Sequence, residues 1–130
     1  MTAFVDTNVL IRHLTGEPQE QARRATAFLA RSDELLLADL VVAEVVYVLE
    51  SFYEVARQEV ARLTRAIVAD QRMVVVDRDL LLRALEVYEV HRIDFADAYL
   101  VASAETTGTG AVVSFDRAIS RVGTIERIEP

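Results

Sequence analysis

Four acidic residues occupy positions from which carboxylates can reach a ligand site. Asp6 and Asp116 each follow a short apolar run of the kind that forms a buried strand. Glu44 stands alone inside an apolar helical stretch, and Asp97 lies in the first turn of a predicted helix. Ligands of open α/β sheets bind beyond the carboxyl ends of the strands, so neighbouring segments would bring all four acids together there. Such a cluster repels itself unless a proton or a cation stabilises it.

Oxygen ligation of a divalent cation is the chemistry that this cluster offers. The chain has no cysteine, which excludes disulfides and thiolate zinc sites. Its two histidines, His13 and His91, are too few for a histidine-rich metal site. Carboxylates with retained waters suit Mg²⁺ or Mn²⁺, and two such ions about 3.5–4 Å apart support in-line hydrolysis of a phosphodiester.

Each acid also has a purely structural interpretation. Asp6 and Asp116 fit turn or capping positions, and Asp97 fits a helix start, where it would complement the helix dipole. Asp94 fits the cap of that same helix. Glu44 would fit a solvated helix stripe, although the valines around it would leave a packed carboxylate in need of a partner. Both interpretations stay open for each residue taken alone.

The composition limits the classes of function. The 130 residues are 52% hydrophobic, so we expect one domain, residues 1–130, with a substantial core. All 14 cations are arginine, and the absence of lysine argues against P-loop NTPases, Schiff-base enzymes and phosphoaspartyl receivers or phosphatases. A net charge of -7 makes non-specific nucleic-acid binding unexpected, but a bound cation can contact phosphate directly. No membrane helix or secretory leader is visible, so we expect a cytoplasmic protein.

Strand and helix patterns alternate along the chain. Alternation of this kind predicts a three-layer α/β/α sandwich with a mainly parallel central sheet. Thr7 and Asn8 would cap the first helix, Asp39 the third and Asp94 the sixth, which Gly108 would close. The predicted strands are 3–5, 34–38, 73–76, 111–115 and 124–128, and the predicted helices are 9–14, 18–31, 39–52, 56–69, 80–91 and 95–107.

The motifs resemble those of PIN-domain ribonucleases, in the same order and at similar spacings. They are VDTNVL at residues 5–10, the lone Glu44, DFADAYLVA at residues 94–102 and VSFD at residues 113–116. The compact chain is also similar to the VapC-type toxins of bacterial and archaeal toxin–antitoxin pairs. The resemblance implies that the catalytic and metal-binding residues are Asp6, Glu44, Asp97 and Asp116.

The activity that the resemblance implies is an Mg²⁺- or Mn²⁺-dependent endoribonuclease, the toxin of a VapBC-type pair. Its products would carry 5′-phosphate and 3′-hydroxyl ends. Thr7, Asn8 and Ser114 would orient Asp6 and Asp116, and whether Asp94 joins the metal site is left open. Arg12, Arg92 and Arg117 are candidates for binding RNA phosphates.

The resemblance also suggests protein partners, namely a cognate antitoxin and a second copy of the chain. Apolar residues at 45–49 and 80–82 would be core, or would bind a partner where they are exposed. An antitoxin would dock helical anchors there and place a basic side chain among the four acids. The alternative from a different class is a catalytically inactive PIN-like module for RNA binding or assembly. The presence of all four acids favours the enzyme.

Overall fold

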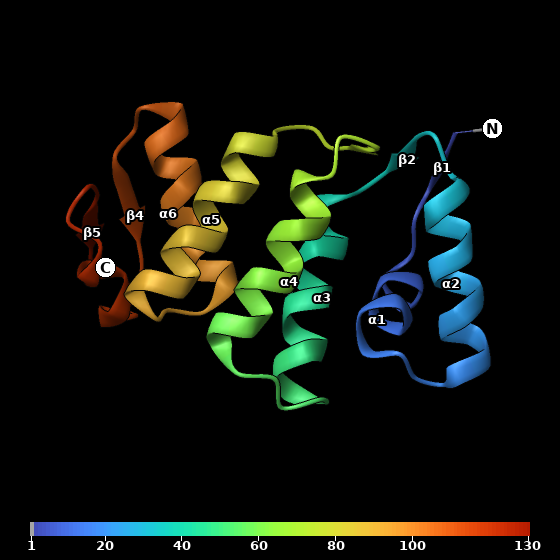
Figure 1. The fold of residues 1–130 in the computed structure, drawn as a ribbon. Helices are drawn as coiled ribbons and strands as arrows, with labels where there is room; N and C mark the ends of the chain where they lie inside the picture. Colours follow the sequence, from blue (N-terminus) through green and yellow to red (C-terminus); the bar gives the residue numbers. More distant parts are fainter. Residues whose placement is uncertain (1) are drawn as a thin grey trace. The chain divides into compact units, whose positions relative to one another are not determined.

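The computed structural model describes residues 2–130, which form two compact units (Figure 1). The first unit ends at Val76 and the second runs from Asp77 to Pro130. Each unit is described by itself below.

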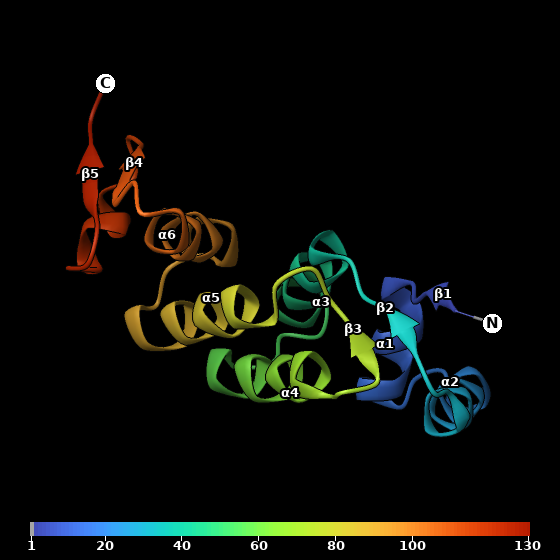
Figure 2. The same ribbon diagram turned by 90° about the horizontal axis from the view of Figure 1, so that it is seen from above.

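The first unit contains a three-stranded sheet and four helices. Its elements are β1 (Ala3–Phe4), α1 (Thr7–Thr15), α2 (Gln19–Arg31), β2 (Leu35–Leu36), α3 (Asp39–Ser51), α4 (Arg57–Ala69) and β3 (Met73–Val74). The strands are parallel in the order β1-β2-β3, and Figure 2 shows β2 between its two neighbours. A pair of helices connects each strand with the next, because parallel strands need a long crossover.

The strands of the first unit are shorter than their apolar runs predict. The strand β2 covers only Leu35–Leu36 and ends before α3 begins at Asp39, so the prediction of 34–38 for the second strand was too long at both ends. Backbone pairing continues slightly past the assigned ends: the Val5 N–H donates to the Leu36 carbonyl at 3.0 Å, and the Leu37 N–H donates to the Val74 carbonyl at 2.9 Å. These bonds hold the chain in register up to Asp6.

Three predicted helix caps in this unit were wrong by one or two residues. Asp6, not Thr7 or Asn8, occupies the N-cap position of α1. Ala38 takes the N-cap of α3, so Asp39 lies in the first turn, where its charge complements the helix dipole. The error is physical: acids and hydroxyls are favoured both at the cap and in the first turn, and residue type alone does not separate the two positions.

Apolar helix faces form the core of the first unit. The helix α1 packs against both α2 and α3, and α3 packs against α4. Burying one large aliphatic side chain contributes about 1.5–3 kcal/mol. Fully or almost fully buried side chains of these elements include Leu10, Ile11, Val42, Val45, Val46, Leu49, Val60 and Val68.

The second unit contains two long helices and a two-stranded parallel sheet. Its elements are α5 (Arg78–His91), α6 (Phe95–Thr107), β4 (Ala111–Val113), the 3-10 helix η1 (Arg117–Arg121) and β5 (Glu126–Ile128). In its sheet, β4 pairs with β5 from Ala111↔Glu126 to Val113↔Ile128. The helices α5 and α6 pack closely, with the rings of Tyr88 and Phe95 in edge contact at 6.3 Å.

The predicted end of α6 is confirmed. Gly108 has a φ of 79°, in the left-handed region that favours glycine. Its N–H donates to the Glu105 carbonyl. Asp94 takes the predicted N-cap position, although its side chain makes no capping hydrogen bond. The sheets of both units are parallel and six α-helices alternate with the strands of residues 2–130, which confirms the predicted α/β class. Within the same residues no helix has the length and apolarity needed to cross a membrane.

Candidate functional site

Asp6 lies where β1 passes into α1. It has an extended backbone, with φ -86° and ψ 154°, and its side chain makes no hydrogen bond to the helix that it precedes. A capping aspartate normally accepts a bond from one of the first helical N–H groups. The Asp6 side chain is exposed and not engaged in capping, so its carboxylate is free to bind a ligand.

Glu44 is linked to the start of α1 by a single hydroxyl. Thr7, only 5% exposed, donates its hydroxyl to the Glu44 Oε2 at 3.3 Å. This bond joins residues 37 positions apart, because α1 packs against α3. Thr7 follows Asp6 in the chain, and its partner is therefore Glu44 and not the expected Asp6. In the first unit Asp6 therefore lies at the start of α1, and Glu44 lies beside the hydroxyl of the following residue, Thr7.

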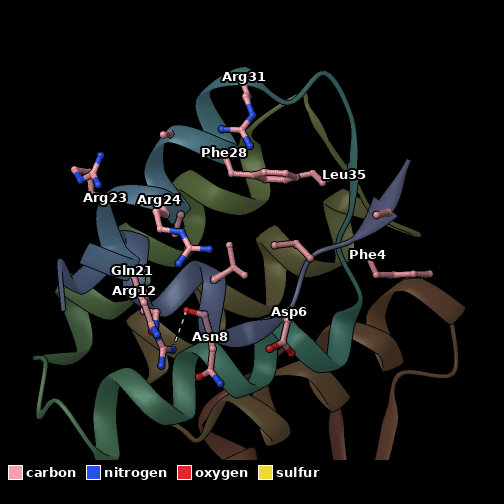
Figure 3. A pocket seen from close by; sticks show the side chains of 15 residues that line it. Phe4, Asp6, Asn8, Arg12, Gln21, Arg23, Arg24, Phe28, Arg31 and Leu35 are labelled. Atoms are coloured by element: carbon pink, nitrogen blue, oxygen red, sulfur yellow. Dashed lines mark hydrogen bonds between the residues drawn. The ribbon is translucent and has the colours of Figure 1, made fainter. Parts of the chain in front are cut away.

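A groove adjoins Asp6 in the first unit. Residues of β1, α1 and α2 line it, together with Leu35, and it has a volume of about 790 Å³. Figure 3 shows Asp6 and Asn8 toward one end of this α1–α2 groove and Phe28 and Arg31 toward the other. Asn8 is exposed, and its carbonyl accepts a hydrogen bond from Arg12 at 3.4 Å. Its side chain makes no hydrogen bond to Asp6 in the described structure, so the expected orienting role stays a prediction.

Asp97 and Asp116 are neighbours in the second unit. Asp97 lies in the first turn of α6, and Asp116 follows β4. Each carboxyl shifts the pKa of the other, so the two groups lie close together. Two carboxylates at such a separation repel each other when both are ionised, which favours a state in which one of them keeps its proton.

The proton belongs to Asp97. Burial, then the hydrogen bond and charge of Asp116, then the charge of Asp94, raise the pKa of Asp97 to about 6. The pKa of Asp116 is lowered, first by the hydrogen bond from the Ala118 backbone N–H and then by the bond to Asp97. When the two carboxyls share one proton, that proton therefore resides mainly on Asp97.

Local hydrogen bonds fix Asp116 in this contact. Its carboxylate accepts the Ala118 N–H at 2.9 Å, and its own N–H donates to the Ser114 hydroxyl at 2.9 Å. The turn interpretation of Asp116 is thus correct, but it does not exclude a ligand role, because the same carboxyl also contacts Asp97. The Asp94 side chain, which is not used in capping, contributes its charge to the same region.

Asp97 and Asp116 lie close together in the second unit, whereas Asp6 and Glu44 of the first unit are linked only through Thr7, which follows Asp6 and bonds to Glu44. Within residues 2–130 no group of three acidic or histidine side chains lies close enough to hold a metal ion. The convergence of all four acids stays a prediction. The second pair nevertheless fits a hard cation: its donors are all oxygen, and burial together with the neighbouring Asp116 raises the pKa of Asp97 to about 6.

A comparison with known families covers both units. The sequence model of the PIN domain matches residues 3–125. The chain belongs to the PIN domain family. A VapC ribonuclease from Aquifex aeolicus (strain VF5) is 27% identical to this PIN domain over 124 residues, which cover 92% of the chain and 91% of that relative. The PIN-like fold expected from the motifs is thereby confirmed.

Proposed function

We propose that this PIN domain is an Mg²⁺- or Mn²⁺-dependent endoribonuclease, the toxin of a VapBC-type pair. The family match and the likeness to a VapC ribonuclease support the class of activity. The observation that carries the metal dependence is the Asp97–Asp116 contact, since a carboxyl that is protonated up to about pH 6 marks a place where a cation would relieve repulsion.

The proposed metal site consists of Asp6, Glu44, Asp97 and Asp116. A divalent cation bound by these carboxylates would polarise the phosphodiester and lower the pKa of a water molecule. Asp97 must lose its proton before it can bind a cation, and with a pKa of about 6 it loses that proton as the pH approaches neutral.

Hydrogen bonds from nearby polar groups position two of these acids, Glu44 and Asp116. Thr7 restricts the rotation of the Glu44 side chain through its hydroxyl. Ser114 and the Ala118 N–H hold Asp116 from two sides. A carboxylate held in this way loses less conformational entropy when a ligand binds, which is the role of hydrogen bonds behind metal ligands.

The family resemblance also supports an antitoxin, a homodimer and a cytoplasmic location as parts of this proposal. Val45, Val46 and Leu49 are core, so the part of α3 that is open to a partner is its exposed side. Leu40 and Tyr47 are exposed by 72% and 69% and lie on the outer side of that helix. Addition of one equivalent of the cognate antitoxin should abolish RNA cleavage, and undiminished cleavage would contradict the pairing.

The direct test is cleavage of total RNA by the purified protein with Mg²⁺ or Mn²⁺. Discrete fragments with 5′-phosphate ends should form, and they should disappear with chelator and with Asp97→Asn. Asp79→Asn is the matched control, because Asp79 is an exposed acid in the first turn of α5 as Asp97 is in the first turn of α6. A folded protein that binds RNA but cleaves none would instead support the inactive RNA-binding module.

A further inference from the structure

The α1–α2 groove combines cations, an aromatic ring and one of the proposed metal ligands. Four arginines line it in a chain of net charge -7. Asp6 lines the same groove. A volume of about 790 Å³ lies within the range of sites that enclose small organic ligands. The groove lies wholly within the first unit.

Two of the four arginines are occupied by neighbours. Arg12 donates its Nε to the Gln21 side chain and a second nitrogen to the Asn8 carbonyl, so it ties α1 to α2. Arg23 forms a salt bridge with Glu20 at 2.8 Å. Arg12, one of the arginines predicted to bind phosphate, is therefore held mainly by contacts within the protein.

The guanidinium N–H groups of Arg24 and Arg31 are available to a ligand. Neither arginine forms a hydrogen bond or a salt bridge with another residue between positions 2 and 130. They lie seven residues apart on α2, about 10 Å along the helix axis. In a stacked single strand, successive phosphates are about 3.4 Å apart along the strand axis, so the two arginines are separated by about the length of a few nucleotides.

Phe28 lies between these two arginines on α2. Its ring is 44% exposed, and the Arg31 guanidinium stands over it at 4.8 Å from the ring centre. Figure 3 shows the ring on the groove side of α2, next to Leu35. An exposed aromatic face beside a free guanidinium is the combination on which unpaired bases stack in single-stranded nucleic-acid sites.

We propose that the α1–α2 groove binds a single-stranded segment of the RNA substrate next to the scissile phosphate. Arg24 and Arg31 bind its phosphates and Phe28 stacks on one of its bases. This assignment rests on the proposed function for its substrate class. It also explains how a strongly acidic protein binds a polyanion, since the cations gather in one groove that includes Asp6.

The charge of the groove favours RNA over a protein partner. A helix docking in an apolar groove needs apolar anchors more than phosphate-like charges. The two free guanidiniums here would have to be paired with acids of such a helix or left uncompensated on docking. RNA supplies anions at regular spacing along with aromatic bases, so one ligand satisfies both features.

The test measures binding separately from cleavage. A labelled 12-nucleotide RNA of random sequence is titrated with Asp97→Asn protein in chelator at several salt concentrations. Adding Arg24→Gln and Arg31→Gln should weaken binding at least about tenfold and reduce the slope of log K against log salt by about 1.4, because each phosphate contact on a single strand contributes about 0.7. Adding Phe28→Leu should weaken binding about tenfold with the slope unchanged.

The matched control is Arg57→Gln with Arg62→Gln, which removes the same charge from α4 in the same unit. Its binding should stay within about twofold of the parent and its slope should not change. Circular dichroism and thermal melting verify that each variant is folded. Equal losses in the control and groove variants would overturn the proposal, because the effect would then be one of net charge.

The outcomes separate this inference from the proposed function. If the protein with intact acids cleaves RNA but the groove variants bind and cleave normally, the groove assignment fails and the nuclease stands. If the groove variants lose RNA binding while the intact protein cleaves nothing, the nuclease fails and the groove stands. Loss of antitoxin inhibition without loss of RNA binding would show a protein-docking groove and overturn the assignment.

Discussion

The two acidic pairs of this PIN domain are held in different ways. In the first unit a hydroxyl connects the elements: Thr7 bonds to Glu44, and Asp6 is exposed. In the second unit two carboxyl groups, those of Asp97 and Asp116, lie close together. Burial and the neighbouring acids raise the pKa of Asp97 to about 6, and the pKa of Asp116 is lowered.

This difference separates two ways to prepare a metal site. A hydroxyl that bonds to a carboxylate positions it without adding a negative charge. Two carboxyls in contact, in contrast, repel each other once both are ionised, and that repulsion lowers stability until a proton or a cation is bound. We therefore expect the first pair mainly to fix where a ligand carboxylate lies, and the second pair mainly to favour the binding of a cation.

The largest expected effect is on catalysis by the second pair. Asp97→Asn keeps a donor for Asp116 but removes a proposed ligand, so cleavage should fall by about 10³-fold or more. Initial rates on one RNA at saturating Mn²⁺ measure the loss. Restoration of the rate at high Mn²⁺ to within tenfold of the intact protein would show that Asp97 is not a ligand that the reaction requires.

A smaller loss is expected from the hydroxyl of the first unit. Thr7→Val preserves shape but frees the Glu44 side chain, so apparent metal affinity in the cleavage assay should fall about 10–100-fold. Thr64→Val is the control, because Thr64 is equally buried and its hydroxyl has no partner in the described structure. Equal activities of the two variants would contradict the positioning role of Thr7.

The repulsion in the second pair should be visible in the stability of the metal-free protein. A folded pKa of about 6, above the value of 3.8 for a free side chain, gives stability that is complete below about pH 3.8 and lost as the pH rises through 6. Asp97→Asn has no such loss. We therefore expect the variant to be more stable at pH 7.5 by about 1 kcal/mol, after screening by solvent, and by clearly less at pH 4.5.

Urea unfolding of both proteins in chelator at the two pH values measures this difference. Addition of Mg²⁺ at pH 7.5 should reduce it, because only the unsubstituted pair gains a cation. An identical stability difference at pH 4.5 and 7.5 would show that the Asp97–Asp116 contact carries no repulsion at neutral pH.

The smallest expected effect concerns the control itself. A buried hydroxyl without a partner is costly, so Thr64→Val should leave the free energy of unfolding unchanged or raise it by up to about 1 kcal/mol. Thr7→Val should lower it by about 0.5–1 kcal/mol, since it breaks a hydrogen bond. A loss for Thr64→Val as large as that for Thr7→Val would indicate a partner for the Thr64 hydroxyl.

Much of the fold could be predicted from the sequence, because its determinants are local. Apolar periodicity predicted all six helices, and Gly108 marked the end of α6. Strand lengths and caps were less accurate. The 34–38 run shows why: apolar composition marks burial, whereas the extent of a strand depends on its pairing partner, here residues near 73.

The sequence allowed us to predict which residues belong to the candidate site better than which of their side chains contact one another. The position of Asp6 after a strand and of Asp97 in a first turn followed from local patterns. The bond from Thr7 to Glu44 did not, because it spans 37 positions and depends on how α1 packs on α3. Arg24 and Arg31 carried no signal, since on a helical wheel they resemble any solvated arginines.

The most direct test of the account is Mn²⁺ binding, followed by electron paramagnetic resonance of the free ion. The proposed function assigns Asp6, Glu44, Asp97 and Asp116 as the ligands of its metal. Asp6→Asn and Asp97→Asn should then each weaken binding at least about tenfold, and the double variant should lose less than the sum of the two free-energy changes. If either single variant binds an ion with the affinity of the unsubstituted protein, the two pairs do not form one site.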